Sequence, residues 1–357
     1  MQSHPDVFVI GGGPAGLAAA IAARRRGFSV TVADSACPPI DKACGEGIMP
    51  DGLAAARSLG LDLESAGGVR FRGIRFCEGD NQVEAAFPHG QGLGMRRTDL
   101  HQLMVDRAAD AGVRMLWATH ANPESVKARW IVAADGGHSP VRRWAGLDAC
   151  QRDSRRFGFR RHYSIAPWSE FMEIHWGDGC QLYITPVDER EVCVVLISRN
   201  QRLRLDDALP QFPEVQRRLA AHRGSLERGG VSASRRLKSV YRGNVALVGD
   251  ASGSVDAITG EGLCLLFQQS VALAAALEAG DLAQYQDEHR RIGKRPALMA
   301  DLMLVMDHRA LLRRRTIQAL AAQPALFSRM LALHVGELNP SQLLTTGLAL
   351  GWQILTV

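Results

Sequence analysis

The sequence predicts an α/β fold in three parts: a parallel sheet flanked by helices, an antiparallel sheet inserted into it, and a helical C-terminal region. Apolar strands end in glycine- or acid-bearing turns near residues 10, 134 and 248, as the strands of a parallel sheet often do. The stretches between these turns have strand-like alternation, and the patterning from residue 281 onward is helical.

The first of these turns carries a glycine motif. Residues 6–10 form an apolar strand that runs into Gly-Gly-Gly-Pro-Ala-Gly at 11–16, and an Ala-rich helix follows. Gly11 permits a tight turn, Gly13 leaves room for a diphosphate, and Gly16 lets the helix pack close to the strand. The free N–H groups at the start of the helix would hold the diphosphate.

A second strand-like run, residues 29–33, ends at Asp34, which is placed to accept hydrogen bonds from a ribose. Strand, glycines, helix, second strand and acid occur in this order within one unit of βαβ size. The start of the chain therefore predicts a bound dinucleotide.

Two later strands end in the same way. An apolar strand at 130–134 ends at Asp135, and another at 245–248 is followed by a glycine and Asp250. A glycine-containing loop then leads into an apolar helix over 263–277. The other predicted elements are helices over 52–59, 95–111 and 205–223 and strands over 69–87, 113–118 and 156–198.

The composition is typical of one large domain or two interleaved domains, with 357 residues of which 46% are hydrophobic. The net charge of +5 comes from arginine, because only four of the 42 basic residues are lysines. The arginines at 152–161 are either a solvated face or a docking surface for an anionic partner, such as a carrier protein. No aromatic residues are interleaved with them, and we expect no nucleic acid partner.

The seven scattered cysteines contain no C-x-x-C pair, which predicts no metal site and no disulfide scaffold and fits a cytoplasmic location. The apolar start of the chain belongs to the nucleotide-binding unit, so we do not expect it to be a signal peptide. The nearest candidate for a membrane span, residues 343–357, is short and contains polar residues. We expect a core or capping helix there, with contact to a membrane surface as the alternative, and no integral membrane association.

The three turns in this order resemble those of the FAD-dependent monooxygenase superfamily, the p-hydroxybenzoate hydroxylase fold, over residues 6–280. The loop at 42–47 and residues 256–262 are similar to the branch of geranylgeranyl reductases and flavin-dependent halogenases. The resemblance implies a Rossmann-like FAD-binding domain with an inserted antiparallel substrate-binding sheet and a helical C-terminal region. The implied FAD-binding domain comprises 1–70, 95–155 and 235–280, the sheet domain 71–94 and 156–234, and the helical region 281–357.

The resemblance also implies which residues bind FAD. Arg97 would reach the diphosphate or ribityl region, Asp250 would hold the ribityl chain, and Asp135 would brace the domain. The alternatives are a surface position or pairing with Asp99 for Arg97, and a turn cap for Asp250. The full set of expected FAD-binding residues is Gly11, Gly13, Pro14, Ala15, Gly16, Asp34, Arg97, Asp135, Asp250, Gly262 and Leu263, the last two through N–H groups facing the flavin ring.

The expected activity is oxygenation of a small, largely apolar organic substrate, with NADPH or NADH as a transient electron donor or a separate flavin reductase as the supplier. The alternative is a carbon–carbon double-bond reductase or dehydrogenase of the geranylgeranyl-reductase type. Residues 181–186 match the strand signature of that branch in the proline and lack its tryptophan. A halogenase would need a lysine beside the flavin, and none lies between Lys42 and Lys127. A non-catalytic flavoprotein that docks a partner is the last alternative.

The expected catalytic residues are Cys44, Glu46 and Tyr183. Cys44 and Glu46 lie in the loop that the reductase branch places beside the flavin ring, and a buried Glu46 with a raised pKa could donate a proton. Other candidates for the pocket are His162, Tyr163, His175 and Trp176.

Overall fold

The computed structural model describes residues 4–338 and 340–356. Its parallel sheet has the strand order β15-β16-β9-β1-β2-β8, and every pairing is parallel except β15 with β16. Val7 pairs with Val30 and with Trp130, so β1 lies in the middle of the sheet between β2 and β9. The strands are β1 (Val7–Ile10), β2 (Val30–Ala33), β8 (Arg114–Leu116), β9 (Trp130–Ala133), β15 (Tyr241–Arg242) and β16 (Val245–Leu247).

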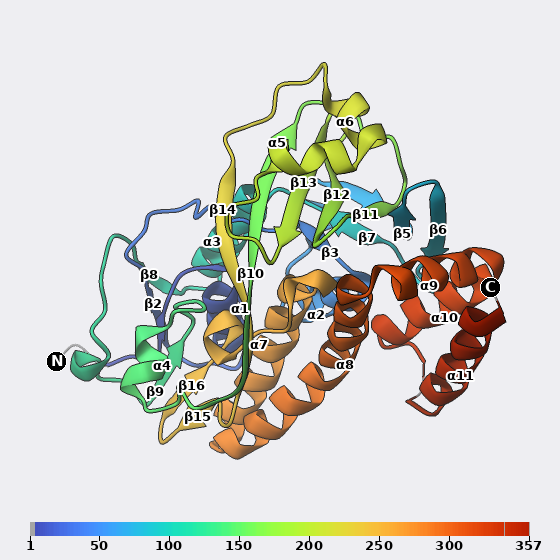
Figure 1. Ribbon diagram of the computed structural model, residues 1–357. Coiled ribbons are helices and arrows are strands. Elements are labelled where there is room, and N and C mark those ends of the chain that lie inside the picture. Colours follow the sequence, from blue (N-terminus) through green and yellow to red (C-terminus); the bar gives the residue numbers. More distant parts are fainter. Residues whose placement is uncertain (1–3, 339, 357) are drawn as a thin grey trace.

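A seven-stranded sheet has the order β14-β10-β13-β12-β11-β5-β6 and lies above the parallel sheet in Figure 1. It is antiparallel except where β5 pairs with β11. Its strands are β5 (Gly73–Glu78), β6 (Asn81–Ala86), β10 (Cys150–Tyr163), β11 (Met172–Trp176), β12 (Cys180–Asp188), β13 (Glu191–Ser198) and β14 (Arg228–Leu237). A small sheet of β3 (Gly47–Ile48), β7 (Gly92–Gly94) and β4 (Val69–Phe71) completes the set. Strand β10 starts before the expected residue 156, because its pairing with β14 runs from Cys150 to Arg160.

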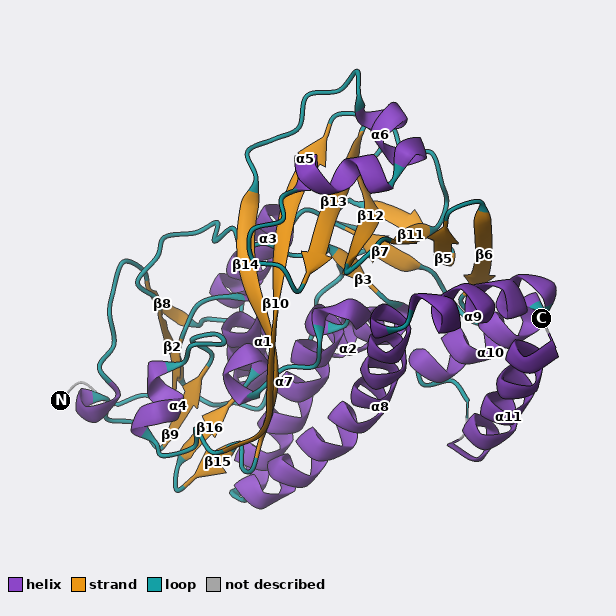
Figure 2. Cartoon of the chain, in the orientation of Figure 1, coloured by secondary structure: helices purple, strands orange, loops and turns teal. Residues whose placement is uncertain are grey.

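The helices cover the parallel sheet and form the C-terminal region (Figure 2). Helices α1, α2 and α8 all pack against α7. The α-helices are α1 (Pro14–Arg25), α2 (Pro50–Ser58), α3 (Arg97–Asp110), α4 (Pro140–Trp144), α5 (Leu205–Ala208), α6 (Pro213–Leu219), α7 (Gly262–Ala279), α8 (Leu282–His308), α9 (Ala310–Ala322), α10 (Pro324–His334) and α11 (Pro340–Thr356).

Within the described residues, α7 is the one helix whose length and apolar composition would suit a membrane span. Residues 343–357 were the nearest candidate for a membrane span expected from the sequence. In the structure the helix with sufficient length and hydropathy is α7 instead. Of that helix, 61% is buried inside the protein, so α7 serves as a core helix that presents its N-terminus to the edge of the parallel sheet.

Candidate active site

The glycine motif forms an open cradle at the start of α1. Gly11 has φ +111°, and a Cβ on it would lie 2.4 Å from the carbonyl oxygen of Ala134. A Cβ on Gly16 would lie 1.8 Å from the carbonyl oxygen of Gly11, so the helix and strand are in direct backbone contact. Gly13 differs, because the nearest atom to its Cβ position is Nη2 of Arg97 at 4.0 Å. The two packing glycines therefore shape the turn, and Gly13 faces free space.

Arg97 closes this space from the first turn of α3. Its Nε is buried and has no hydrogen-bond partner among the described residues. A partly buried cation whose Nε is unpaired, beside the N–H groups at a helix start, fits a bound anion. The cradle thus fits the diphosphate of FAD, with Gly13 and Arg97 next to each other in its lining.

Asp34, expected at the ribose, contacts the same loop as a buried histidine that the sequence did not single out. Asp34 accepts hydrogen bonds from the backbone N–H of Gly12 at 2.6 Å and of Ala36 at 2.8 Å. Buried His101 donates through Nε2 to the Gly12 carbonyl at 2.8 Å, and burial lowers the pKa of His101. A neutral imidazole therefore holds the loop. The sequence did contain a clue to His101. It lies one helical turn after Arg97, so both side chains are on the same face of the helix.

The other expected FAD-binding residues lie around the ends of β9 and β16. The Asp250 carboxylate pairs with the Lys42 ammonium at 2.8 Å, and both side chains are about half exposed. Asp135 accepts from the Ser139 hydroxyl at 2.5 Å and from the Val141 N–H at 3.1 Å. Its carboxylate therefore braces the start of α4, as a structural role requires.

The two motif residues Pro14 and Ala15 begin α1, and a Cβ on Gly249 would lie 2.5 Å from that of Ala15. The N-terminus of α7 is also open, because a Cβ on Gly262 would meet no atom within 4 Å. Leu263 follows it and is buried. Free N–H groups at such a helix start stabilise negative charge.

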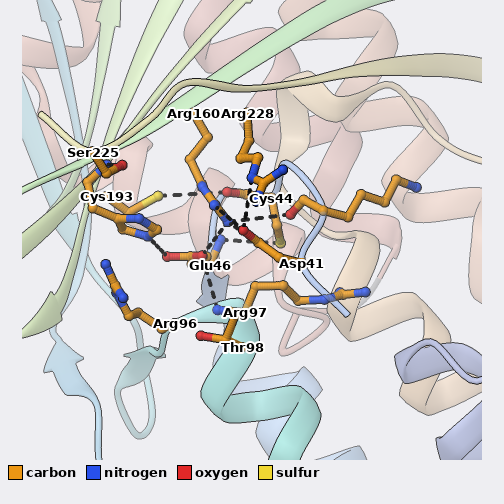
Figure 3. Close-up of polar contacts among 12 residues, drawn as sticks. Asp41, Cys44, Glu46, Arg96, Arg97, Thr98, Arg160, Cys193, Ser225 and Arg228 are labelled. Atoms are coloured by element: carbon orange, nitrogen blue, oxygen red, sulfur yellow. Dashed lines mark hydrogen bonds and ion pairs between the residues drawn. The ribbon is translucent and has the colours of Figure 1, made fainter. Parts of the chain in front are cut away.

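Glu46 lies at the centre of a buried polar cluster beside this cradle (Figure 3). Its Oε1 accepts hydrogen bonds from the backbone N–H of Arg97 and from Nη1 of Arg160, both at 3.0 Å. Its Oε2 lies 2.7 Å from Nε2 of His162. Glu46 has φ +59°, a left-handed conformation that is rare for a residue with a side chain. The backbone of the loop thus holds the carboxylate between a permanent cation and an imidazole.

Arg160 links this carboxylate to the rest of the loop. It donates to both carboxylate oxygens of Asp41 at 2.8 and 2.9 Å, and this contact lowers the pKa of Asp41. The Cys193 thiol lies 3.7 Å from the carbonyl oxygen of Cys44. Burial raises the pKa of both cysteines, so both are thiols at neutral pH.

Glu46, His162 and Cys193 offer ligand atoms that all lie within 4.8 Å of one another, which is close enough for a metal ion. The Arg160 guanidinium already supplies the positive charge beside the carboxylate at 3.0 Å. A second cation there would be repelled. We therefore assign the cluster to hydrogen bonding and proton movement. The sequence did not reveal that these three residues lie together. The strand register explains why these residues lie together, because His162 on β10 pairs with Cys193 on β13.

Tyr183 lies in a different environment from Cys44 and Glu46. Its hydroxyl donates to the carbonyl oxygen of Ile258 at 2.6 Å, in the loop before α7, and burial raises its pKa. Of the other pocket candidates, Tyr163 is buried, His175 bonds Glu173 at 2.9 Å, and Trp176 packs edge-on against Phe76. The structure thus brings Cys44, Glu46 and His162 together and gives Tyr183 a bracing contact with the loop.

A second buried charge cluster lies behind the start of α7. Glu261 precedes Gly262, is 3% exposed, and lies 3.9 Å from His334. Asp51 pairs with Arg295 at 3.2 Å in the same cluster. Burial, with Asp51 adding to it, raises the pKa of Glu261 to about 8, and burial lowers that of His334 to about 4. The sequence analysis gave these residues no role, since they come from four separate helices.

Most of the arginines at 155–161 form ion pairs with acidic residues of the same chain. Buried Arg156 contacts Asp256 at 3.2 Å and Asp307 at 2.6 Å, and Arg161 contacts Asp206 at 2.7 Å. The side chain of Arg152 lies outside the described part of the chain.

Two family models match the chain. The pyridine nucleotide-disulphide oxidoreductase model matches residues 5–147, and the FAD binding domain model matches residues 119–294. Together they span both halves of the cradle described above. Both matches agree with the FAD-dependent superfamily that the sequence motifs resemble. This flavoprotein is an FAD-dependent oxidoreductase.

Similar proteins share most of the length of the flavoprotein. Menaquinone reductase of Mycobacterium tuberculosis is 29% identical, over 84% of this chain and 81% of its own. Digeranylgeranylglycerophospholipid reductase 2 of Methanopyrus kandleri is 27% identical, over 79% of this chain and 81% of its own. A flavoprotein/dehydrogenase from Cytophaga hutchinsonii has a TM-score of 0.78 at 17% identity, covering 93% of this chain and 92% of that one. The last likeness confirms the fold.

Proposed function

We propose that this flavoprotein is an FAD-dependent carbon–carbon double-bond reductase that acts on an apolar, isoprenoid-containing lipid. The observation that carries the proposal is the buried pair of Glu46 and His162, 2.7 Å apart, in the loop that bears the Cys44 thiol. Reduction of a double bond needs a hydride and a proton, and this cluster holds protons at defined atoms. The names of the two reductases above support the same substrate class.

The chain's own residues would hold the cofactor. Gly13 and Arg97 would bind the diphosphate and Asp34 the ribose, while Asp250 would bind the ribityl chain in place of its contact with Lys42. When bound, FAD supplies hydride transfer. NADPH or NADH, or a separate reductase, would supply the electrons, and a cytoplasmic location would suit this supply.

Proton delivery would start at Cys44. Its raised pKa keeps Sγ protonated, so the thiol can give a proton to one carbon of the double bond while the hydride goes to the other carbon. The backbone N–H of Glu46 lies 3.4 Å from that Sγ and stabilises the thiolate left behind. A proton from solvent water then restores the thiol, by way of the Glu46–His162 pair joined through Oε2 and Nε2. Arg160 holds the Glu46 carboxylate in place throughout.

Anaerobic single turnover tests the proposal. The FAD-loaded protein is reduced with dithionite and mixed with menaquinone or with a digeranylgeranyl lipid, while flavin absorbance and product mass are followed. We expect flavin reoxidation with a product that gains two hydrogen atoms in its isoprenoid chain, which mass fragmentation distinguishes from reduction of the quinone ring. Cys44→Ser should slow this step about 100-fold, while Cys37→Ser, at an exposed position, should leave it unchanged.

Oxygenation, the activity that the sequence analysis favoured, is the second candidate. It is favoured by the superfamily to which the chain belongs. No reoxidation by either lipid without oxygen, together with an oxygen-containing product in air, would replace the reductase proposal with this one. Bromide in the aerobic reaction would reveal a halogenase by a brominated product.

A further inference from the structure

Helix α8 carries a stripe of exposed apolar side chains along its C-terminal half. Leu298, Leu302 and Val305 are 39%, 43% and 48% exposed. Their spacing of four and three residues places them on one face of the helix. Leu311, at the start of α9 and three residues past the end of α8, is 71% exposed. We call these four residues the apolar stripe.

Single exposed apolar residues are ordinary on protein surfaces. Several exposed apolar residues close together in sequence, as here, are typical of a surface that binds a partner or a membrane. The stripe lies in the C-terminal helical group, at the right of the molecule in Figure 1. On α11 of the same group, Leu348 is 68% and Trp352 70% exposed, one helical turn apart. Exposed Trp and Leu on helices are typical of proteins that rest on a lipid bilayer.

Basic side chains bracket the apolar stripe. Lys294 lies four residues before Leu298, on the same face of α8, and Arg309 and Arg315 follow Val305. All three are exposed, and none forms an ion pair with a residue that the structure describes. Asp301, also exposed on α8, is already engaged in a contact of its own. The stripe is therefore an apolar surface with unpaired positive charge at both ends.

From this pattern we propose that the apolar stripe and its basic flanks dock the protein on the surface of an anionic lipid bilayer. The leucines and valine would enter the boundary between headgroups and acyl chains, and Lys294, Arg309 and Arg315 would contact anionic headgroups. This arrangement is peripheral and agrees with the burial of α7 in the core. The proposal deepens the proposed function, because a lipid substrate would be met at the bilayer, but vesicle binding needs no turnover.

Vesicle sedimentation of the FAD-loaded protein tests the docking surface. Vesicles of phosphatidylcholine mixed with phosphatidylglycerol are compared with vesicles of phosphatidylcholine alone, at low and high salt. We expect binding to the anionic vesicles that weakens with salt. Leu302→Glu with Val305→Glu should weaken it about tenfold or more. Arg309→Ala with Arg315→Ala should weaken binding and reduce its salt dependence.

The control is Leu226→Glu, an equally drastic change at a side chain that is 87% exposed on the loop before β14. It should bind vesicles as the wild type does, and all variants should retain the flavin spectrum of the folded protein. Equal binding by the stripe variant and the control would overturn the proposal. So would a concentration-dependent dimer in light scattering that the stripe variant abolishes, because a second copy would then cover the stripe. Loss of vesicle binding with unchanged single turnover on dispersed lipid supports docking and leaves the reductase proposal intact.

Discussion

Glu261→Gln tests whether the buried acid at the start of α7 is protonated in the folded protein. Oε2 of Glu261 is buried and has no hydrogen-bond partner among the described residues. Burial, reinforced by Asp51, raises the pKa of the carboxyl from 4.5 to about 8. Each pH unit between these two values lowers the free energy of unfolding by about 1.4 kcal/mol, so the acid costs about 4 to 5 kcal/mol of stability at pH 8.

The sign follows from which state holds the proton. In this pH range the unfolded chain has released it and the folded protein has kept it, so a rise in pH favours unfolding. Glutamine has a similar shape and cannot ionise. The stability of the variant minus that of the wild type should therefore grow as pH rises toward 8 and then level off. Burial lowers the pKa of His334 to about 4, so the free energy of unfolding also falls below about pH 6.5, where this histidine is protonated only in the unfolded chain. This fall is the same in the variant and in the wild type.

Chemical denaturation followed by tryptophan fluorescence, at several values between about pH 5 and pH 8, measures this difference. Glu189→Gln, at an exposed position beside the β12–β13 turn, is the matched control and should show no such growth. A difference that stays constant with pH, or that falls as pH rises, would refute the reasoning. Glu261 would then be ionised and stabilised by Arg295.

Three further changes test the cofactor cradle and the loop. Gly13→Ala should leave the apoprotein as stable as the wild type and weaken FAD binding, because its Cβ would enter the free space beside Arg97; flavin fluorescence titration measures this. Gly16→Ala should destabilise the fold by about 3 kcal/mol or more, seen as a lower denaturation midpoint, because its Cβ would lie 1.8 Å from a carbonyl oxygen. Asp250→Ala should fold and lose most of its FAD, and full retention in the absorbance spectrum would contradict the role of that turn. Glu46→Gln should slow single turnover about 100-fold, measured by the rate of flavin reoxidation.

The cofactor cradle was predictable because its parts are close together in sequence. The strand, the glycines and the helix at 6–25 occur in one unit, and each glycine has a local reason for its position. The apolar runs that end at Asp135 and near Asp250 predicted two more strands of the same sheet, which are β9 and β16. Helix α7 was likewise predictable from a single apolar segment.

The polar cluster could not be predicted, since its members meet through strand register. Glu46 and Arg160 are separated by 114 residues, and His162 reaches Cys193 only because β10 pairs with β13. The sequence shows an arginine-rich strand there, which is equally consistent with a solvated face. Alternation along β10 turns Arg156 and Arg160 inward, where carboxylates from other elements pair with them.

The order of strands in the parallel sheet has a consequence for how the protein forms during synthesis. Strand β1 at Val7–Ile10 has neighbours in β2 and in β9, and β9 in turn needs β16 at Val245–Leu247. The nucleotide-binding sheet therefore stays incomplete until about two thirds of the 357 residues have left the ribosome. Contacts of such long sequence separation close slowly. The nascent chain thus has to protect the edge of β1 until β9 has been made, and then the edge of β9 until β16 has been made.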